Sequence, residues 1–191
     1  MSNFTILLDA NVLYGQYIRN FLMYLAQTRV VRFRWTEAIL DECFENLKAN
    51  RPDLDPSRLE QTKRLMMTRV VNDAVVTGYQ GLIDTLELPD PDDRHVLAAA
   101  IMCHAQTIMT FNRRDFPDSV LEPLGIKAVR PDEVILDLID LDAIRVQRAL
   151  LSLHASLKKP PMTIEHLLDL LSRDGLTRST EVLREMLGTI D

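Results

Sequence analysis

The chain has 191 residues, of which 47% are hydrophobic and 26% charged, a composition that is typical of a globular protein and excludes a disordered one. Its formal net charge of −6 argues against a protein that binds nucleic acid through overall positive charge. No apolar run reaches the roughly 18–20 residues that cross a bilayer, and the start lacks a basic leader segment, so we expect a cytoplasmic protein without membrane association.

The first two thirds of the chain alternate between strand and helix patterns. Strands are predicted at 4–9, within 73–79, at 107–111 and at 126–129. Helices are predicted at 18–27, 37–50, 57–71, 92–105 and 118–125, and another begins at Pro131. Thr36 is the expected N-cap of one helix, and Gly125 is expected to end another. This alternation predicts an α/β domain with a mainly parallel sheet over residues 1–137.

The remaining residues, 138–191, carry only helical patterns. Helices are predicted at 141–157, 164–175 and 179–190, with a break at the KKPP segment. We interpret them as a C-terminal helical extension whose apolar stripes pack on the main domain or on another chain.

Several acidic residues are expected at one edge of this sheet. Asp9 ends the first strand, where ligands of open α/β sheets bind, and with Asn11 it is equally suited to capping the following turn. Thr110, Asn112 and Asp115 follow the strand at 107–111, where a simple turn is the alternative interpretation.

The stretch LPDPDDRHVLAAA at 88–100 contains more negative charge than a helix cap requires. Asp90 is the expected N-cap, Pro91 suits the first helical position, and Asp93 has capping-box spacing. Asp93 also lies one turn ahead of the buried row that starts at Val96, so its carboxylate needs a partner, for which a cation is one candidate. Asp92 is either a supporting acid or a solvated neighbour.

Parallel strands bring their carboxyl ends together, so these acids are expected to converge. Converging carboxylates repel one another unless a positive charge lies between them. Oxygen ligands with retained waters suit Mg²⁺ or Mn²⁺, and such a cluster without a glycine-rich phosphate loop indicates metal-assisted phosphodiester hydrolysis.

The order of these residues resembles the PIN-domain ribonucleases, and within them the VapC-like toxins of type II toxin–antitoxin pairs. The matching segments are LLDANVL (7–13), WTEAILDE (35–42), DPDDRHVLAAA (90–100), TFNRRDF (110–116) and RPDEVI (130–135).

The resemblance implies an α/β/α sandwich, a site for Mg²⁺ or Mn²⁺, and endoribonuclease activity. It matches Asp9, Glu42 and Asp93 to the three core acids of the family, although Glu42 alone would be read as a solvated residue at the helix edge. Asn112 stands where the family commonly has an aspartate, and Asp115 is the candidate that supplies the missing charge. The resulting catalytic set is Asp9, Glu42, Asp93 and Asp115, with metal ligands Asp9, Asp93 and Asp115, supporting residues Asn11, Asp92, Thr110 and Asn112, and RNA contacts Arg113 and Arg114.

The expected partners are an RNA substrate (tRNA, rRNA or mRNA), an antitoxin protein and a second copy of the chain in a homodimer. A dehalogenase-like phosphatase is disfavoured, because Asn11 stands where that class needs a second aspartate. A non-catalytic PIN-like module that binds nucleic acid and a metal-dependent DNA nuclease remain alternatives. No histidine is given a catalytic role.

Overall fold

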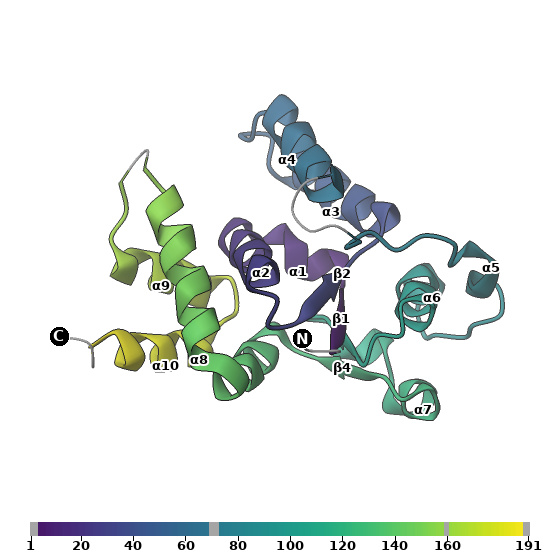
Figure 1. Cartoon of the computed structure of the whole chain (residues 1–191). Coiled ribbons are helices and arrows are strands. Elements are labelled where there is room, and N and C mark those ends of the chain that lie inside the picture. Colours follow the sequence, from purple (N-terminus) through teal and green to yellow (C-terminus); the bar gives the residue numbers. More distant parts are fainter. Residues whose placement is uncertain (1–3, 69–72, 159–160, 189–191) are drawn as a thin grey trace.

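A parallel four-stranded sheet lies at the centre of the molecule, as Figure 1 shows. The structure is a computed structural model that describes residues 4–68, 73–158 and 161–188. The strands follow one another in space in the order β2 (Arg32–Arg34), β1 (Thr5–Leu8), β3 (Thr107–Met109) and β4 (Lys127–Val129). The predicted α/β class with a mainly parallel sheet is thus confirmed.

Strand β1 is fully buried because helices cover both faces of the sheet, which explains its unbroken apolar sequence. Leu8 is aligned with Met109, and the ladder continues beyond both strands. The Asp9 N–H donates to the Met109 carbonyl at 3.1 Å, and the Thr110 N–H donates to the Val129 carbonyl at 3.0 Å. Asp9 and Thr110 therefore leave neighbouring strands at the same edge of the sheet.

The edge strand β2 was not predicted from the sequence. It has only three residues, and Phe33 is buried between two arginines, so its apolar signal is a single side chain. The strand expected within 73–79 is present only as an isolated parallel bridge between Trp35 and Val75.

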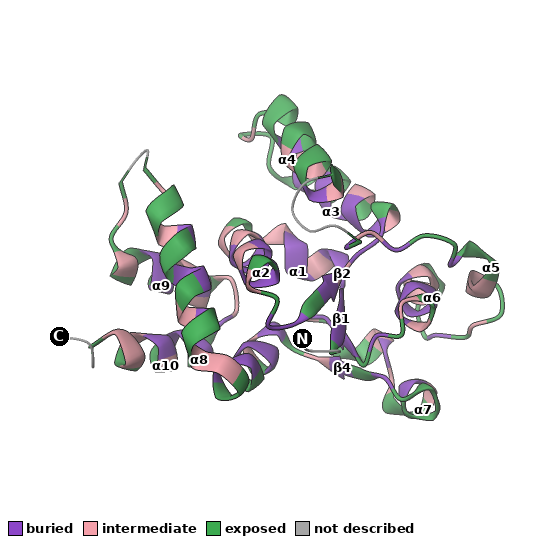
Figure 2. Ribbon diagram, in the orientation of Figure 1, coloured by how far each residue is buried: buried purple, intermediate pink, exposed green. Residues whose placement is uncertain are grey.

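Helices flank the sheet on both sides, with α1 and α2 on one side and α6 and α7 on the other (Figure 1). The α-helices that precede the C-terminal part are α1 (Ala10–Tyr14), α2 (Gln16–Thr28), α3 (Glu37–Asn50), α4 (Pro56–Thr68), α5 (Gln80–Ile83), α6 (Arg94–Met102) and α7 (Asp118–Leu121). Short 3₁₀ turns are η1 (Pro91–Asp93), η2 (Arg113–Asp115) and η3 (Glu122–Leu124). Figure 2 shows that β1 and the inward faces of the helices are buried, whereas the edge strand β2 is partly exposed and α4 is largely exposed.

Two expected caps are present. The Ile39 N–H donates to Thr36 Oγ1 at 3.0 Å at the start of α3, and Gly125 adopts a φ of +68° after η3. Parts of the predicted helices, at 69–71 and 189–190, lie outside the described residues.

The C-terminal helices are α8 (Pro131–Ser156), α9 (Ile164–Arg173) and α10 (Thr177–Gly188). Both helices that were expected, one from Pro131 and one at 141–157, lie within α8 and meet at a kink, where Asp142 leaves helical geometry with φ −158° and ψ 79°. The expected domain boundary between residues 137 and 138 falls inside the segment of α8 that precedes the kink, and it stays a prediction.

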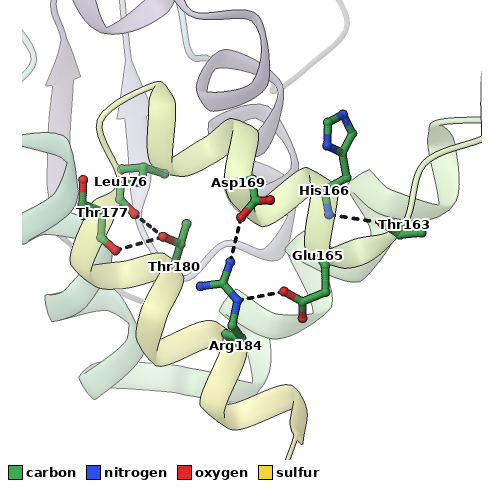
Figure 3. Close-up of polar contacts among 8 residues, drawn as sticks. All are labelled: Thr163, Glu165, His166, Asp169, Leu176, Thr177, Thr180 and Arg184. Carbon is green, nitrogen blue, oxygen red and sulfur yellow. Dashed lines mark hydrogen bonds and ion pairs between the residues drawn. The ribbon is translucent and has the colours of Figure 1, made fainter.

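The C-terminal helices pack on one another and on α2. Arg184 of α10 reaches Glu165 at 2.8 Å and Asp169 at 3.1 Å on α9, and the Thr180 hydroxyl donates to the Leu176 carbonyl at 2.7 Å, as Figure 3 shows. One apolar face of these helices packs within this chain: Val146, Leu150, Leu167, Leu171 and Leu183 are all 0% exposed. A second apolar group on α8 is exposed, formed by Leu141, Ile144 and Leu151.

Two carboxylates tie the C-terminal helices to the elements beside them. Asp132, in the first turn of α8, accepts from the N–H groups of Arg178 and Ser179 and thus caps α10. Asp174 accepts from the N–H groups of Tyr17 and Ile18 and caps α2, whose own N-cap residue has no side chain for this purpose. In the described ranges, no helix combines the length and the apolar character that a membrane span requires.

Replacing Asp132 by Ala is expected to lower the free energy of unfolding by about 1–2 kcal/mol, because α10 loses its cap. Urea unfolding at neutral pH measures this change. Asp169→Ala removes only an exposed ion pair and serves as the control, with an expected loss below about 1 kcal/mol. Equal losses in the two variants would contradict the capping role.

Candidate active site

The carboxylate of Asp9 is held in place from three directions. It is 4% exposed, and its Oδ1 accepts from the Ala10 N–H at 2.7 Å, so Asp9 does cap helix α1. Its Oδ2 accepts from Thr110 Oγ1 at 2.7 Å and from Asn11 Nδ2 at 2.6 Å. Asp9 therefore caps α1 through Oδ1, while its Oδ2 contacts the other residues of the candidate site.

Asn11 connects the two strand ends. Its Nδ2 donates to Thr110 Oγ1 at 3.1 Å, and its Oδ1 accepts from the Phe111 N–H at 3.1 Å. The Thr110 hydroxyl also accepts from the Asn112 N–H at 3.0 Å. The structure thus places Asn11 and Thr110 around Asp9, as the sequence predicted.

Asp93 ends the 3₁₀ turn η1 and directly precedes α6. Asp90 caps this turn as predicted, but its side chain accepts from the Asp92 N–H at 2.9 Å, and the Asp93 N–H donates to the Asp90 carbonyl. The expected capping box is therefore wrong. The Asp93 side chain makes no cap hydrogen bond among the residues that the structure describes, so its carboxylate is free for another role.

The acids interact electrostatically across the edge of the sheet. Burial raises the pKa of Asp93 to about 7, with further contributions from the negative charges of Asp9, Asp115 and Asp90 and from a hydrogen bond with Asp115. Burial also raises the pKa of Asp9, with a smaller contribution from Glu42, while the hydrogen bonds from Thr110 and Ala10 oppose this shift. The residue after β1 and the elements α3, η1 and η2 thus contribute carboxylates that interact at this edge of the sheet.

Glu42, on α3, is exposed, and its Oε2 lies 3.5 Å from Nε2 of His95 on α6. The Nδ1 of His95 is buried and has no hydrogen-bond partner within the described residues. Sequence reasoning gave His95 no role. Its place two residues after Asp93 was the only sign that it lies among the acids.

The loop after β3 supplies the last group of candidates. Asn112 Nδ2 donates to Asp115 Oδ2, so the amide that replaces the usual aspartate orients the acid three residues later. Arg113 and Arg114 are exposed on the same turn, and Asp92 is exposed on η1. The structure thus brings Asp115 to Asp93, while the two arginines and Asp92 face solvent.

This arrangement suits a hard cation. Within the part of the chain that the structure describes, none of Asp9, Asp93 and Asp115 is paired with a lysine or arginine, although the negative charges of Asp9 and Asp115 raise the pKa of Asp93. Their donors are carboxylate oxygens, which Mg²⁺ and Mn²⁺ prefer. No three Asp, Glu, His or Cys side chains of the described residues form a ready-made metal site.

The raised pKa of Asp93 predicts a pH dependence of stability in the metal-free protein. Since the folded state holds this proton more tightly than the unfolded state, the contribution of Asp93 to stability is largest below about pH 4 and is lost as the pH rises through about 7. Asp93→Asn is expected to remove this dependence and to be more stable than wild type at pH 8 by on the order of 1–2 kcal/mol, a value discounted for solvent screening.

Chemical unfolding in EDTA between pH 4 and 8 measures the difference between Asp93→Asn and wild type. Asp92→Asn is the control for the change in net charge, because its side chain is exposed on the same turn. A difference between Asp93→Asn and wild type that does not change with pH would show that Asp93 lies in an ordinary solvated environment.

Comparison with known proteins places this geometry in a family. The sequence model of the PIN domain matches residues 5–114, and that of the VapC50 C-terminal domain matches residues 131–185. A protein of Mycobacterium tuberculosis strain H37Rv named "Putative ribonuclease VapC50" is 40% identical over 98 residues, which cover 51% of this chain and 57% of that protein. No solved structure shows a significant match. With the parallel sheet and the acids at its carboxyl edge, these matches show that the chain belongs to the PIN domain family.

Proposed function

We propose that this protein is a metal-dependent endoribonuclease that acts as the toxin of a toxin–antitoxin pair. The observation that carries the proposal is that the negative charges of Asp9 and Asp115 both act on the half-buried carboxylate of Asp93, and that none of the three pairs with a lysine or arginine among the described residues. Membership of the PIN domain family and the similarity to a protein named as a ribonuclease support it.

Asp9, Asp93 and Asp115 would hold Mg²⁺ or Mn²⁺, partly through water, since Mg²⁺ commonly keeps several waters in protein sites. The bound ion would lower the pKa of a water and stabilise negative charge on the attacked phosphate. In-line attack by this water would leave a 5′-phosphate and a 3′-hydroxyl.

The other residues of the candidate site have separate proposed roles. Thr110 and Asn11 fix the orientation of Asp9 through hydrogen bonds to its Oδ2, and Asn112 orients Asp115. Glu42 is exposed at the edge of the acidic group, and we assign it the task of accepting a proton at Oε2. Asp92 contributes negative charge from the same turn as Asp93.

RNA needs a positive contact in a protein of net charge −6. Arg113 and Arg114 are exposed on η2, next to Asp115, where they are available to phosphates on either side of the scissile bond. We therefore assign them to the binding of the RNA backbone, with tRNA, rRNA or mRNA as the substrate.

A toxin of this kind requires an inhibitor. The exposed acidic edge suits a basic segment of an antitoxin, with an arginine directed at the carboxylates. A homodimer completes the proposed assembly, because two copies can combine basic surfaces that one chain offers only in part.

Asp9→Asn and Asp93→Asn are each expected to lower the rate of RNA cleavage by at least about 100-fold, because each removes a proposed metal ligand. Purified protein free of antitoxin is incubated with total RNA and Mg²⁺ or Mn²⁺, with EDTA and single-stranded DNA as parallel arms. Asp53→Asn, which alters an exposed carboxylate paired with Arg51, is the matched control and should cleave normally.

Cleavage that persists in both site variants, or in EDTA, would overturn the metal site. Cleavage of DNA but not of RNA would replace the ribonuclease by a deoxyribonuclease. Expression of the wild type should arrest bacterial growth and expression of Asp9→Asn should not. Growth arrest by both would contradict a toxin that acts through its nuclease activity.

Arg113→Gln combined with Arg114→Gln is expected to weaken RNA binding in a cleavage-inactive Asp9→Asn background. If each arginine neutralises one phosphate of single-stranded RNA, the slope of log K against log salt falls by about 0.7 for each, which titrations at several salt concentrations measure. Arg58→Gln removes a charge from α4 that is also exposed, and it should leave the slope unchanged. Equal effects of the Arg113/Arg114 and Arg58 changes would assign binding to general charge instead of this loop.

A further inference from the structure

We propose that the turn formed by Asp174 and Gly175, which follows α9, positions the loop that carries Thr110 and Phe111, and through it the carboxylate of Asp9. The turn belongs to the C-terminal helices, whereas the loop belongs to the candidate site. This inference rests on the proposed function, because the positioned group is the proposed metal ligand. The C-terminal helices would thereby help to fix the geometry of the candidate site.

Gly175 ends α9 in a conformation that favours glycine. Its φ is +104°, its N–H donates to the Ser172 carbonyl at 3.0 Å, and the Leu176 N–H donates to the Leu171 carbonyl at 3.0 Å. These two bonds form a Schellman motif, in which glycine is the usual residue. This local requirement explains the glycine at position 175, but it does not explain which side chain packs against that glycine.

The ring of Phe111 lies directly against this glycine. A β-carbon at position 175 would lie 2.6 Å from Cε1 and 2.8 Å from Cζ of Phe111, which is closer than non-bonded carbons approach. The missing side chain of Gly175 therefore provides the space that the aromatic ring occupies.

Phe111 transmits this contact to the site within one residue. Its N–H donates to Asn11 Oδ1 at 3.1 Å, and Asn11 Nδ2 donates to Asp9 Oδ2 at 2.6 Å. The preceding residue, Thr110, donates to the same Asp9 oxygen. A displacement of the Phe111 ring would pull on a backbone whose N–H and neighbouring hydroxyl both orient Asp9.

Asp174 fixes the other side of the turn. Its Oδ2 accepts from the N–H groups of Tyr17 and Ile18, both at 3.0 Å, at the start of α2. A β-carbon at Gly15 would lie 2.8 Å from this carboxylate, so the chain approaches closely here as well. The turn is thus anchored on α2, which follows α1 and Asp9 in the chain, and cannot recoil freely from Phe111.

Gly125 provides a control of the same local structure. It has a φ of +68°, and the bonds from Gly125 to Glu122 and from Ile126 to Leu121 repeat the Schellman pattern. A β-carbon at this position would meet no described heavy atom within 4 Å. Gly125→Ala therefore strains a left-handed residue as Gly175→Ala does, but without contact with the loop of the site.

The experiment compares Gly175→Ala with Gly125→Ala in the full chain. We expect Gly175→Ala to lower kcat for RNA cleavage about 10- to 100-fold with little change in KM, since a displacement of about 1 Å near a reacting centre has this effect. The affinity for Mn²⁺ alone, followed by the electron paramagnetic resonance of free Mn²⁺ well below the melting temperature, should fall about tenfold. Gly125→Ala should match wild type in both measurements.

A rescue variant separates positioning from general destabilisation. Phe111→Leu in the Gly175→Ala background removes the ring atoms that the new methyl group would meet. It should restore the Mn²⁺ affinity, although the backbone strain that alanine causes at position 175 remains. Failure of Phe111→Leu to restore the affinity would overturn the proposal. If Gly175→Ala does not fold, Phe111→Ala takes its place, with reduced Mn²⁺ affinity supporting the proposal and wild-type affinity overturning it.

The outcomes also distinguish this inference from the proposed function. If Asp9→Asn loses Mn²⁺ binding and cleavage while Gly175→Ala behaves like Gly125→Ala, the site stands and the positioning role is overturned. If wild-type protein shows neither Mn²⁺ binding nor cleavage that depends on Asp9, the proposed function is overturned and the inference with it.

Discussion

The parallel pairing of β1 with β3 is the constraint on which the site depends. Because Leu8 is aligned with Met109, the next residues of both strands, Asp9 and Thr110, leave the sheet side by side, and the hydroxyl of one donates to the carboxylate of the other. A shift of one residue would turn these side chains to the opposite face. The pairing of the buried apolar strand β1 therefore fixes the position of the Asp9 carboxylate, which follows the strand.

The same edge of the sheet accumulates negative charge that the fold itself does not need. Burial and neighbouring carboxylates raise the pKa of Asp93 to about 7, although carboxylates at exposed helix starts are usually favourable. The chain compensates with large apolar cores on both sides of the sheet, formed by residues such as Phe21, Trp35 and Leu97. Conflict of this kind between local charge and stability is typical of functional sites.

The C-terminal helices are joined to the elements around the sheet by polar contacts as well as by apolar packing. Asp174 satisfies backbone N–H groups at the start of α2, and Asp132 does the same between α8 and α10. Arg19 of α2 donates to the Leu13 carbonyl at the end of α1 at 2.7 Å. A capping hydrogen bond requires a more exact placement of its donor and acceptor than an apolar contact does. The cap formed by Asp174 connects the turn after α9 to α2, which follows α1 and Asp9 in the chain.

The sequence by itself determined the α/β class, the positions of the strands β1, β3 and β4 along the chain, and the caps at Thr36 and Asp90, because these features depend on local periodicity and on short motifs. The same motifs predicted the acids of the candidate site. It did not predict β2, whose apolar signal is one residue. Only the tertiary structure decided that His95 faces Glu42 and that Phe111 lies against Gly175. These contacts join residues from separate elements, so they depend on how helices and strands pack, which local sequence patterns do not encode.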